Sequence, residues 1–242
     1  MNPRELTARK VHAALEREPR VNLHRRPIRI HAQDGAVILE GEVADVAAKK
    51  LALEAAAAAE GVSGVVDRLR VDPGEARGDG AIRDSFARLL LEQAEFLNCT
   101  VRVRTNEKSA VLRKKEDGAG DIEISVTDGV ILLEGRMISV PHRLFAGAVA
   151  WWTPGRRDVI NALEVVPPYE ERDEEVTEAL RLALEADPLL EADQIRSQCR
   201  DWVVTLEGAV PTEEQRHRAE LGAWSLSGVD KVINRLQVAP QR

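Results

Sequence analysis

The chain has 242 residues, of which 44% are hydrophobic and 31% are charged, a composition typical of globular rather than disordered proteins. This length indicates two or three compact units rather than one small domain. The formal net charge of −7 argues against a general polyanion-binding protein. The aromatic fraction of 3% predicts cores built from Val, Ile, Leu and Ala, with few rings left for cofactor binding.

The acidity is concentrated at the C-terminal end of the chain. Residues 1–72 carry 12 Lys and Arg against 11 Asp and Glu, and residues 73–166 carry 13 against 14. Residues 167–242 carry 9 basic side chains against 16 acidic ones. An anionic partner is therefore expected to prefer the first two segments.

The N-terminus carries no recognisable targeting segment. Residues 1–7 lack the apolar core of a signal peptide, and no apolar run reaches the about 20 residues that span a bilayer. We therefore expect a cytoplasmic protein. Peripheral attachment to a membrane stays open, and a periplasmic location is the alternative.

One block of sequence occurs three times. It starts with Asp, usually followed by Gly, and continues through apolar residues to a Glu-Gly pair. The three copies are residues 34–41 (DGAVILEG), 128–135 (DGVILLEG) and 201–208 (DWVVTLEG). In each copy a second glycine follows 20 residues after the first, at Gly61, Gly155 and Gly228. This constant spacing indicates three tandem copies of one module.

Each module is predicted to begin with a helix and a hairpin. Apolar residues recur at steps of three and four over Leu6–Glu18, Ile82–Phe96 and Val176–Glu185, which is typical of an amphipathic helix. After a first strand, the Asp-Gly pair at residues 34–35 is chemistry typical of a hairpin turn into a second strand.

A second helix is predicted between the two glycines of each module. Its N-terminus is marked at one offset by residues that cap free amides, and its C-terminal glycine is expected in the left-handed conformation. The capping residues are Asp45, Ser139 and Thr212, the last forming a capping box with Gln215. Alanines four residues apart are expected to seat this helix on the sheet: Ala52 and Ala56, Ala146 and Ala150, and Ala219 and Ala223.

Each module is predicted to end in a strand, because residues 65–71, 159–165 and 232–238 are β-branched and end in period-two alternation. The order is therefore α-β-β-α-β, an α+β fold. Since the second helix joins two strands across some 20 residues, a right-handed parallel crossover is expected. Both helices then lie on one face of a three-stranded mixed sheet.

The predicted repeats are residues 4–72, 80–166 and 174–240. A flexible linker, Pro73–Gly80, and a stiff acidic one, Pro167–Glu175, separate them. Repeat 2 carries an insertion near residues 105–120, which we place between its first two strands. Its polar residues, with the pair Asp117-Gly118, predict a long hairpin.

These blocks resemble the BON family, a module of bacterial osmotic-stress and nodulation-associated proteins. The central pattern of that family, D-G-x-V-x-L-x-G-x-V, is matched by residues 34–43, and its terminal pattern, G-V-x-x-V-x-N-x-L-x-V, by residues 228–238. Trp202 replaces the turn glycine in repeat 3, and Arg156 replaces the valine after Gly155 in repeat 2. The resemblance implies a non-catalytic domain that binds phospholipid or attaches proteins to envelopes.

We find no constellation of residues that indicates an enzyme, a metal site or a cofactor. The five histidines, His12, His24, His31, His142 and His217, show no paired ligand spacing. Cys99 and Cys199 are expected to be reduced packing residues, with a disulfide between them as the alternative. A recurring glutamate at 40, 134 and 207 either pairs with the basic residue at 49, 143 and 216, or both groups are solvated.

Two groups of residues are candidate contact sites for a phospholipid surface or a protein partner. The first is Trp152 with Arg156 and Arg157, because Trp152 lies about 200° around the helix from Ala150 and should face away from its own sheet. Packing of Trp152 against a neighbouring repeat is the alternative. The second is Arg25, Arg26 and Arg29, which either bind an anionic partner or form a solvated loop.

The sequence therefore predicts a non-enzymatic binding or scaffold protein that associates with phospholipid membranes or envelope components in stress protection. The alternative is a protein–protein adaptor that does not bind lipid. Nucleic acid is not an expected partner, because the net charge is negative and no aromatic stacking platform accompanies the basic residues. The sequence does not indicate an oligomeric state.

Overall fold

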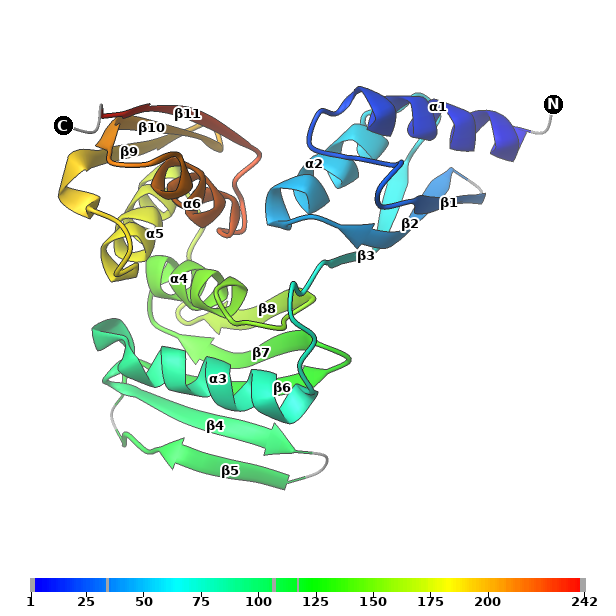
Figure 1. Ribbon diagram of the computed structural model, residues 1–242. Coiled ribbons are helices and arrows are strands. Elements are labelled where there is room, and N and C mark those ends of the chain that lie inside the picture. The colour runs from blue at the N-terminus through cyan, green and yellow to red at the C-terminus, as the bar shows by residue number, and fades with distance from the viewer. Residues whose placement is uncertain (1–2, 34, 106–107, 117, 240–242) are drawn as a thin grey trace. The chain divides into compact units, whose positions relative to one another are not determined.

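Figure 1 shows the computed structural model of the chain, which describes residues 3–33, 35–105, 108–116 and 118–239. The chain divides into two compact units, Met1–Asp72 and Pro73–Arg242. The first unit holds repeat 1, and the second holds repeats 2 and 3. Asp34, assigned to the first hairpin turn from the sequence, lies outside the described residues.

Repeat 1 has the predicted α-β-β-α-β order. Strand β2 pairs antiparallel with β1 and parallel with β3, so the sheet is mixed and has the order β1-β2-β3. Helices α1 and α2 contact each other and the strands, and they bury the apolar face of the sheet. The elements are α1 (Pro3–Arg17), β1 (Ile28–Gln33), β2 (Ala36–Val43), α2 (Val46–Ala57) and β3 (Gly64–Val71).

Repeat 3 has the same order and the same sheet pattern. Strand β10 pairs antiparallel with β9 and parallel with β11. The elements are α5 (Asp173–Ala186), a 3-10 turn η2 (Ala192–Gln194), β9 (Ile195–Arg200), β10 (Val203–Val210), α6 (Glu213–Trp224) and β11 (Lys231–Val238).

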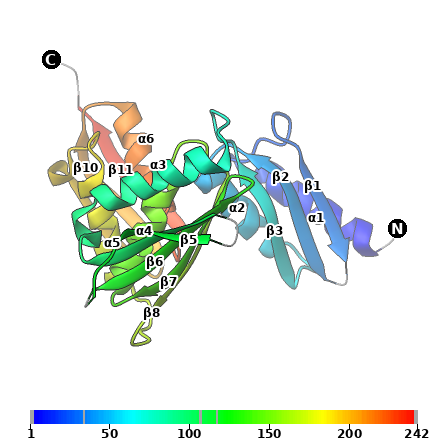
Figure 2. The ribbon, with the colours of Figure 1, turned by 90° about the horizontal axis from the view of Figure 1, so that it is seen from below.

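Repeat 2 contains a five-stranded sheet instead of the predicted three-stranded one. Its strand order is β5-β4-β6-β7-β8, and Figure 2 shows α3 and α4 on one side of it. The elements are α3 (Asp79–Glu92), a 3-10 turn η1 (Ala94–Phe96), β4 (Cys99–Thr105), β5 (Lys108–Arg113), β6 (Gly120–Thr127), β7 (Val130–Met137), α4 (Val140–Trp151) and β8 (Asp158–Val165).

The predicted position of the insertion in repeat 2 is wrong. Strand β6 joins β7 through the two-residue turn Asp128-Gly129, so these are the first two strands of the module and nothing is inserted between them. The additional residues form β4 and β5, which lie between η1 and β6 in sequence and extend the sheet beyond β6. The hairpin turn expected at Asp117-Gly118 cannot be compared with the structure, because Asp117 lies outside the described residues; Gly118 belongs to the connection between β5 and β6.

The glycines predicted to end the second helices adopt the left-handed conformation, but each lies four residues beyond the last helical residue, which is Ala57, Trp151 or Trp224. Gly61, Gly155 and Gly228 have φ of +86°, +85° and +81°, which L side chains rarely adopt. In the hairpin turn before β10, Trp202 stands where repeats 1 and 2 have Gly35 and Gly129. Its φ of +63° also lies in the left-handed region. A non-glycine residue there costs about 1–3 kcal/mol, so neighbouring contacts must hold this turn in place.

An aspartate at the start of the first helix provides such contacts in repeats 2 and 3. The carboxylate of Asp173 accepts hydrogen bonds from the backbone N–H groups of Asp201 and Trp202 at 2.7 and 3.1 Å. In repeat 2 the carboxylate of Asp79 accepts from Asp128 and Gly129 at 2.9 and 2.8 Å. Each carboxylate therefore fastens the hairpin turn to the helix that precedes it.

All three predicted residues occupy the N-cap position, and two of them make the side-chain capping hydrogen bond. Asp45 accepts from the backbone N–H of Ala48 at 2.8 Å, and Thr212 accepts from that of Gln215 at 3.2 Å. Ser139 makes no such bond and instead lies 3.0 Å from His142 Nδ1. The capping box at Thr212 is incomplete, because the Gln215 side chain donates to the carbonyl of Leu189.

Helix α4 is buried on almost all sides, whereas α2 and α6 each leave part of their surface exposed. The six predicted alanines of the three helices are fully buried, which confirms how each helix sits on its sheet. In α4, residues 144–150 are all buried as well. This helix contacts its own strands, α3 and, in repeat 3, α5. Repeats 2 and 3 therefore pack against each other through their helices (Figure 1).

Both cysteines are free and buried, as predicted. None of the described helices has the length and apolar character needed to cross a membrane.

Candidate functional site

The first predicted contact site is the turn that follows α4. Trp151 is half-buried, and the guanidinium of Arg156 lies 5.8 Å from the centre of its ring, within cation–π range. Arg157 is half-buried, donates its backbone N–H to the carbonyl of Gly129 at 2.8 Å, and lays its aliphatic stem along that glycine. The corresponding turns are Ala-Ala-Ala-Glu-Gly in repeat 1 and Trp-Ser-Leu-Ser-Gly in repeat 3, so the combination of two rings and two arginines belongs to repeat 2.

Trp152 is half-buried and packs within its own repeat. Its ring meets the ring of Phe145 edge to face, with centroids 6.0 Å apart. Phe145 in turn stacks on Phe96 at 5.5 Å, and both phenylalanines are fully buried. Trp152 is thus the outer end of an aromatic row, with part of its ring accessible to solvent. Trp224, the counterpart of Trp151 in repeat 3, is buried.

The second predicted site, on the segment that leads into β1, is largely neutralised. Arg26 pairs with the carboxylate of Asp72, and Arg29 pairs with that of Glu40, with 2.6 Å between Nη2 and Oε1. Arg25 is exposed, and its backbone N–H donates to the side chain of Asn22 at 3.0 Å. Two of the three guanidinium groups therefore already have an acidic partner within repeat 1.

Of the two alternatives for the recurring glutamate, the ion pair with the second helix does not form among the described residues. The glutamate alternates with buried strand residues and so lies on the face of the sheet opposite the helices. There it is bound by an arginine of the same sheet: Glu40 by Arg29, Glu134 by Arg104, and Glu207 by Arg235. Arg104 comes from the inserted strand β4, so the insertion supplies a partner that the neighbouring core strands of repeat 2 lack.

The polar residue that recurs in the last strand fastens that strand to the second helix. Asn161 donates to the carbonyl of Arg143 at 2.7 Å, and Asn234 donates to that of Arg216 at 3.0 Å. Asp67 in repeat 1 cannot donate in this way. The buried Lys49 replaces the bond, with Nζ 2.9 Å from Asp67 and 3.0 Å from the carbonyl of Leu69. This contact is structural in each repeat.

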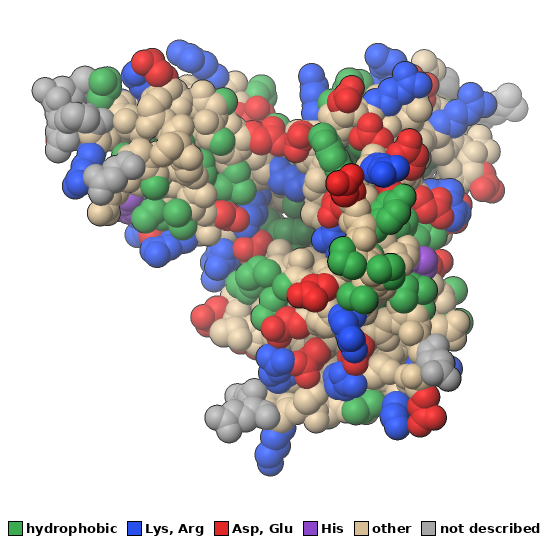
Figure 3. Space-filling model, turned by 180° about the vertical axis from the view of Figure 1, so that it is seen from behind, with side chains coloured by type: hydrophobic (Ala, Val, Ile, Leu, Met, Phe, Trp, Pro, Cys, Tyr) green, Lys and Arg blue, Asp and Glu red, His purple; other side chains and the backbone are tan. Residues whose placement is uncertain are grey.

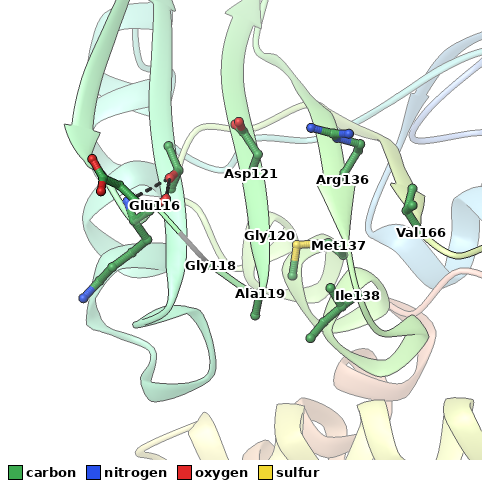
Figure 4. Close-up of a pocket in the computed structure, with 11 residues that line it drawn as sticks. Glu116, Gly118, Ala119, Gly120, Asp121, Arg136, Met137, Ile138 and Val166 are labelled. Atoms are coloured by element: carbon green, nitrogen blue, oxygen red, sulfur yellow. Dashed lines mark hydrogen bonds between the residues drawn. The ribbon is translucent and has the colours of Figure 1, made fainter.

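Repeat 2 also contains a cavity of about 280 Å³ beside the connection from β5 to β6 (Figure 4). Lys115, Asp121 and Arg136 contribute charged groups to its wall, and Met137 contributes a sulfur. The hydroxyl of Thr100 is occupied by the backbone of Lys115, from which it accepts at 2.9 Å and to which it donates at 3.0 Å. Asp121 is bound by Arg102. Among these lining residues we find no nucleophile with a neighbouring base.

The thiols are held in their protonated form. Burial, together with the hydrogen bond to Asp173, raises the pKa of Cys199 to about 12, and burial raises the pKa of Cys99. In the described ranges no group of three or more His, Cys, Asp or Glu side chains is placed to hold a metal ion.

The BON domain model matches three segments of the chain, residues 4–73, 101–167 and 172–240. The chain belongs to the BON family. The three matches correspond to the three modules seen in the structure, and the resemblance drawn from the sequence is confirmed. The second match begins downstream of α3, within β4.

Among solved structures, similarity is found to two of CdsD, a structural protein of the type III secretion system of Chlamydia trachomatis. The first, of its C-terminal domain, is 14% identical, covers 99% of this chain and 100% of that one, and has a TM-score of 0.25. The second is 14% identical, covers 96% and 92%, and has a TM-score of 0.26. The comparison with curated proteins finds no match.

Proposed function

We propose that this BON protein is a binding scaffold that attaches peripherally to anionic phospholipid surfaces. Membership of the BON family supports a binding or scaffold role in general. Attachment to lipid is the more specific step, and the turn after α4 is the observation that carries it.

That turn combines the two side-chain types that favour a membrane interface. The indoles of Trp151 and Trp152 are half-buried, so each presents an apolar ring with an accessible part at the surface. Arg156 lies over the ring of Trp151 and places a positive charge beside it. Such a pair suits the boundary between acyl chains and acidic headgroups.

Vesicle flotation tests this function. The full chain should float with vesicles that contain phosphatidylglycerol at low salt and should stay behind with phosphatidylcholine alone. Added salt should weaken binding, because screening reduces the attraction of basic side chains to the surface. Absence of flotation at low salt would contradict lipid attachment and leave the protein–protein adaptor as the better reading.

The site is tested by two variants. Arg156→Gln should weaken partition into these vesicles by about five-fold, the effect of one basic side chain near an anionic surface. Arg88→Gln, an exposed change of the same charge on α3, is the matched control and should have a smaller effect. Equal partition of Arg156→Gln and the wild-type chain would rule out the turn as the contact site.

A further inference from the structure

The uncovered face of the sheet in repeat 3 is strongly basic, although this repeat is the most acidic part of the chain. We propose that this face is a contact surface for anionic phospholipid headgroups. The inference rests on the proposed function and assigns to it a second site, on a different module from the turn after α4.

Strand register places the basic side chains at four corners of this face. Val203 of β10 lies between Arg200 and Lys231, and Glu207 lies between Arg196 and Arg235. All four basic residues are exposed. Neighbouring strands are about 4.8 Å apart and residues rise about 3.3 Å along a strand, so the four Cα positions frame a rectangle of roughly 10 by 13 Å. Its centre is the uncharged row Gln198, Thr205 and Ile233.

The remaining described basic residues of repeat 3 are occupied elsewhere. Three of them have carboxylate partners, and the fourth lies over an aromatic ring. They are Arg181 with Glu178 and Glu185, Arg216 with Glu213, Arg218 with Asp187, and Arg172 over Tyr169. Of the four basic side chains on the sheet face, Arg235 has a carboxylate at ion-pair distance. The other three have none among the described residues. Positive charge is thus concentrated on this face.

The equivalent faces of the other two repeats are nearly balanced in charge. In repeat 1, Glu40 and Glu42 on β2 lie opposite Arg68 and Arg70 on β3. In repeat 2, arginines of β4 are bound to carboxylates of β6 and β7. Figure 3 looks onto the side of repeat 2 away from α3 and α4, and acidic and basic side chains are interspersed there, in the lower part of the view. A sheet face with a clear excess of positive charge is therefore found in repeat 3 and not in repeats 1 and 2.

The size and chemistry of this face favour a lipid surface over other anionic partners. Three strands of at most eight residues offer a few hundred Å², below the about 800 Å² that each partner buries in a stable protein complex. No aromatic side chain lies on the face for bases to stack on. A bilayer needs neither feature, because it presents many headgroups to a flat basic surface at once.

Removing two of the four charges tests the inference. Arg196→Gln with Arg200→Gln should weaken binding of the full chain to phosphatidylglycerol vesicles by about twenty-five-fold, since each basic side chain contributes about five-fold. The matched control, Arg181→Gln with Arg216→Gln, changes the net charge equally but alters helices, and its effect should be several-fold smaller. Circular dichroism would verify that both variants are folded.

Removing the single acidic group of the face should act in the opposite direction. Glu207→Gln releases Arg235 and should strengthen vesicle binding by about five-fold, whereas Glu185→Gln on α5 should change it less. If the wild-type chain binds vesicles and the variants of the face bind equally well, the inference fails while the proposed function stands. If the wild-type chain ignores vesicles, both fail. The inference would also fail if substitutions on this face weakened binding to an acidic polypeptide but did not change binding to vesicles.

Discussion

The second helices of repeats 2 and 3, α4 and α6, hold the same position in their modules but differ in how much of their surface is buried. Ala148 of α4 lies about 200° around the helix from the sheet-facing Ala146, and it is nevertheless fully buried. Its counterpart in α6, Leu221, is half-buried, and its counterpart in α2, Glu54, is exposed. The same fold therefore occurs with the outer side of its second helix covered, as in repeat 2, and with that side accessible to solvent, as in repeats 1 and 3.

This difference follows from sequence. The segment 140–151 contains no acidic residue, whereas 213–224 contains three glutamates. A helix that is apolar all round must be covered on all sides. The comparison teaches that the helix face of a BON module decides whether it packs against its neighbour, while the α-β-β-α-β order is common to all three.

The largest expected effect comes from placing a charge on the covered side of α4. Ala148→Glu should lower the free energy of unfolding by about 3–5 kcal/mol, because the carboxylate is buried without a partner. Leu221→Glu should change it by no more than about 1 kcal/mol. All four tryptophans lie in residues 73–242, so urea unfolding followed by tryptophan fluorescence reports on this unit. Equal effects of the two substitutions would break the comparison.

A smaller effect is expected where an aspartate fastens the hairpin turn. Asp173→Ala should cost about 1–3 kcal/mol, because two backbone N–H groups of a turn strained at Trp202 lose their acceptor. Asp79→Ala should cost less, since Gly129 adopts its turn without strain. The same fluorescence assay measures both, and a larger loss for Asp79→Ala would contradict this view of the turn.

The contribution of Asp173 should also depend on pH. Its hydrogen bonds to the two backbone N–H groups lower its pKa below the usual 3.8, so its stabilising effect is present above about pH 4. It is lost as the pH falls through the lowered pKa of the folded state. The difference in unfolding free energy between the wild-type chain and Asp173→Ala should therefore shrink below pH 4, and a difference that grows would contradict it.

The smallest effect concerns the two thiols. With the pKa of Cys199 raised to about 12 and that of Cys99 also raised, neither should react measurably with a disulfide reagent at pH 8 in the folded chain. Both should react promptly in denaturant. Reaction of one thiol in the native protein would show that its repeat opens more readily than the other.

Much of the fold could be predicted from sequence, because glycine spacing, caps and apolar periodicity are local signals. The insertion could not be placed by periodicity, since β4 and β6 both alternate and either could follow the first helix. The two-residue turn Asp128-Gly129 was the signal that distinguishes them, because it matches the turn before β2 and requires β6 to be the partner of β7.

The candidate surfaces were predicted less well. Ion pairs to Asp72 and Glu40 depend on contacts across the fold, which no local pattern around Arg26 and Arg29 reveals. The basic face of repeat 3 was hidden by counting charge over the whole segment. Strand alternation separates its arginines from the acidic residues of the helices, but only once the register of three strands is known.

The two inserted strands of repeat 2 also change how this module can meet other chains. In repeats 1 and 3 the first strand of the module is a sheet edge, whereas in repeat 2 that strand is internal and β5 is the edge. An exposed edge can recruit further strands and start aggregation, and lysines on it discourage this. If two copies of β5 paired side by side, antiparallel and in full register, Lys108 of one chain would lie opposite Arg113 of the other. Like charges there would oppose growth of the sheet from one molecule to the next.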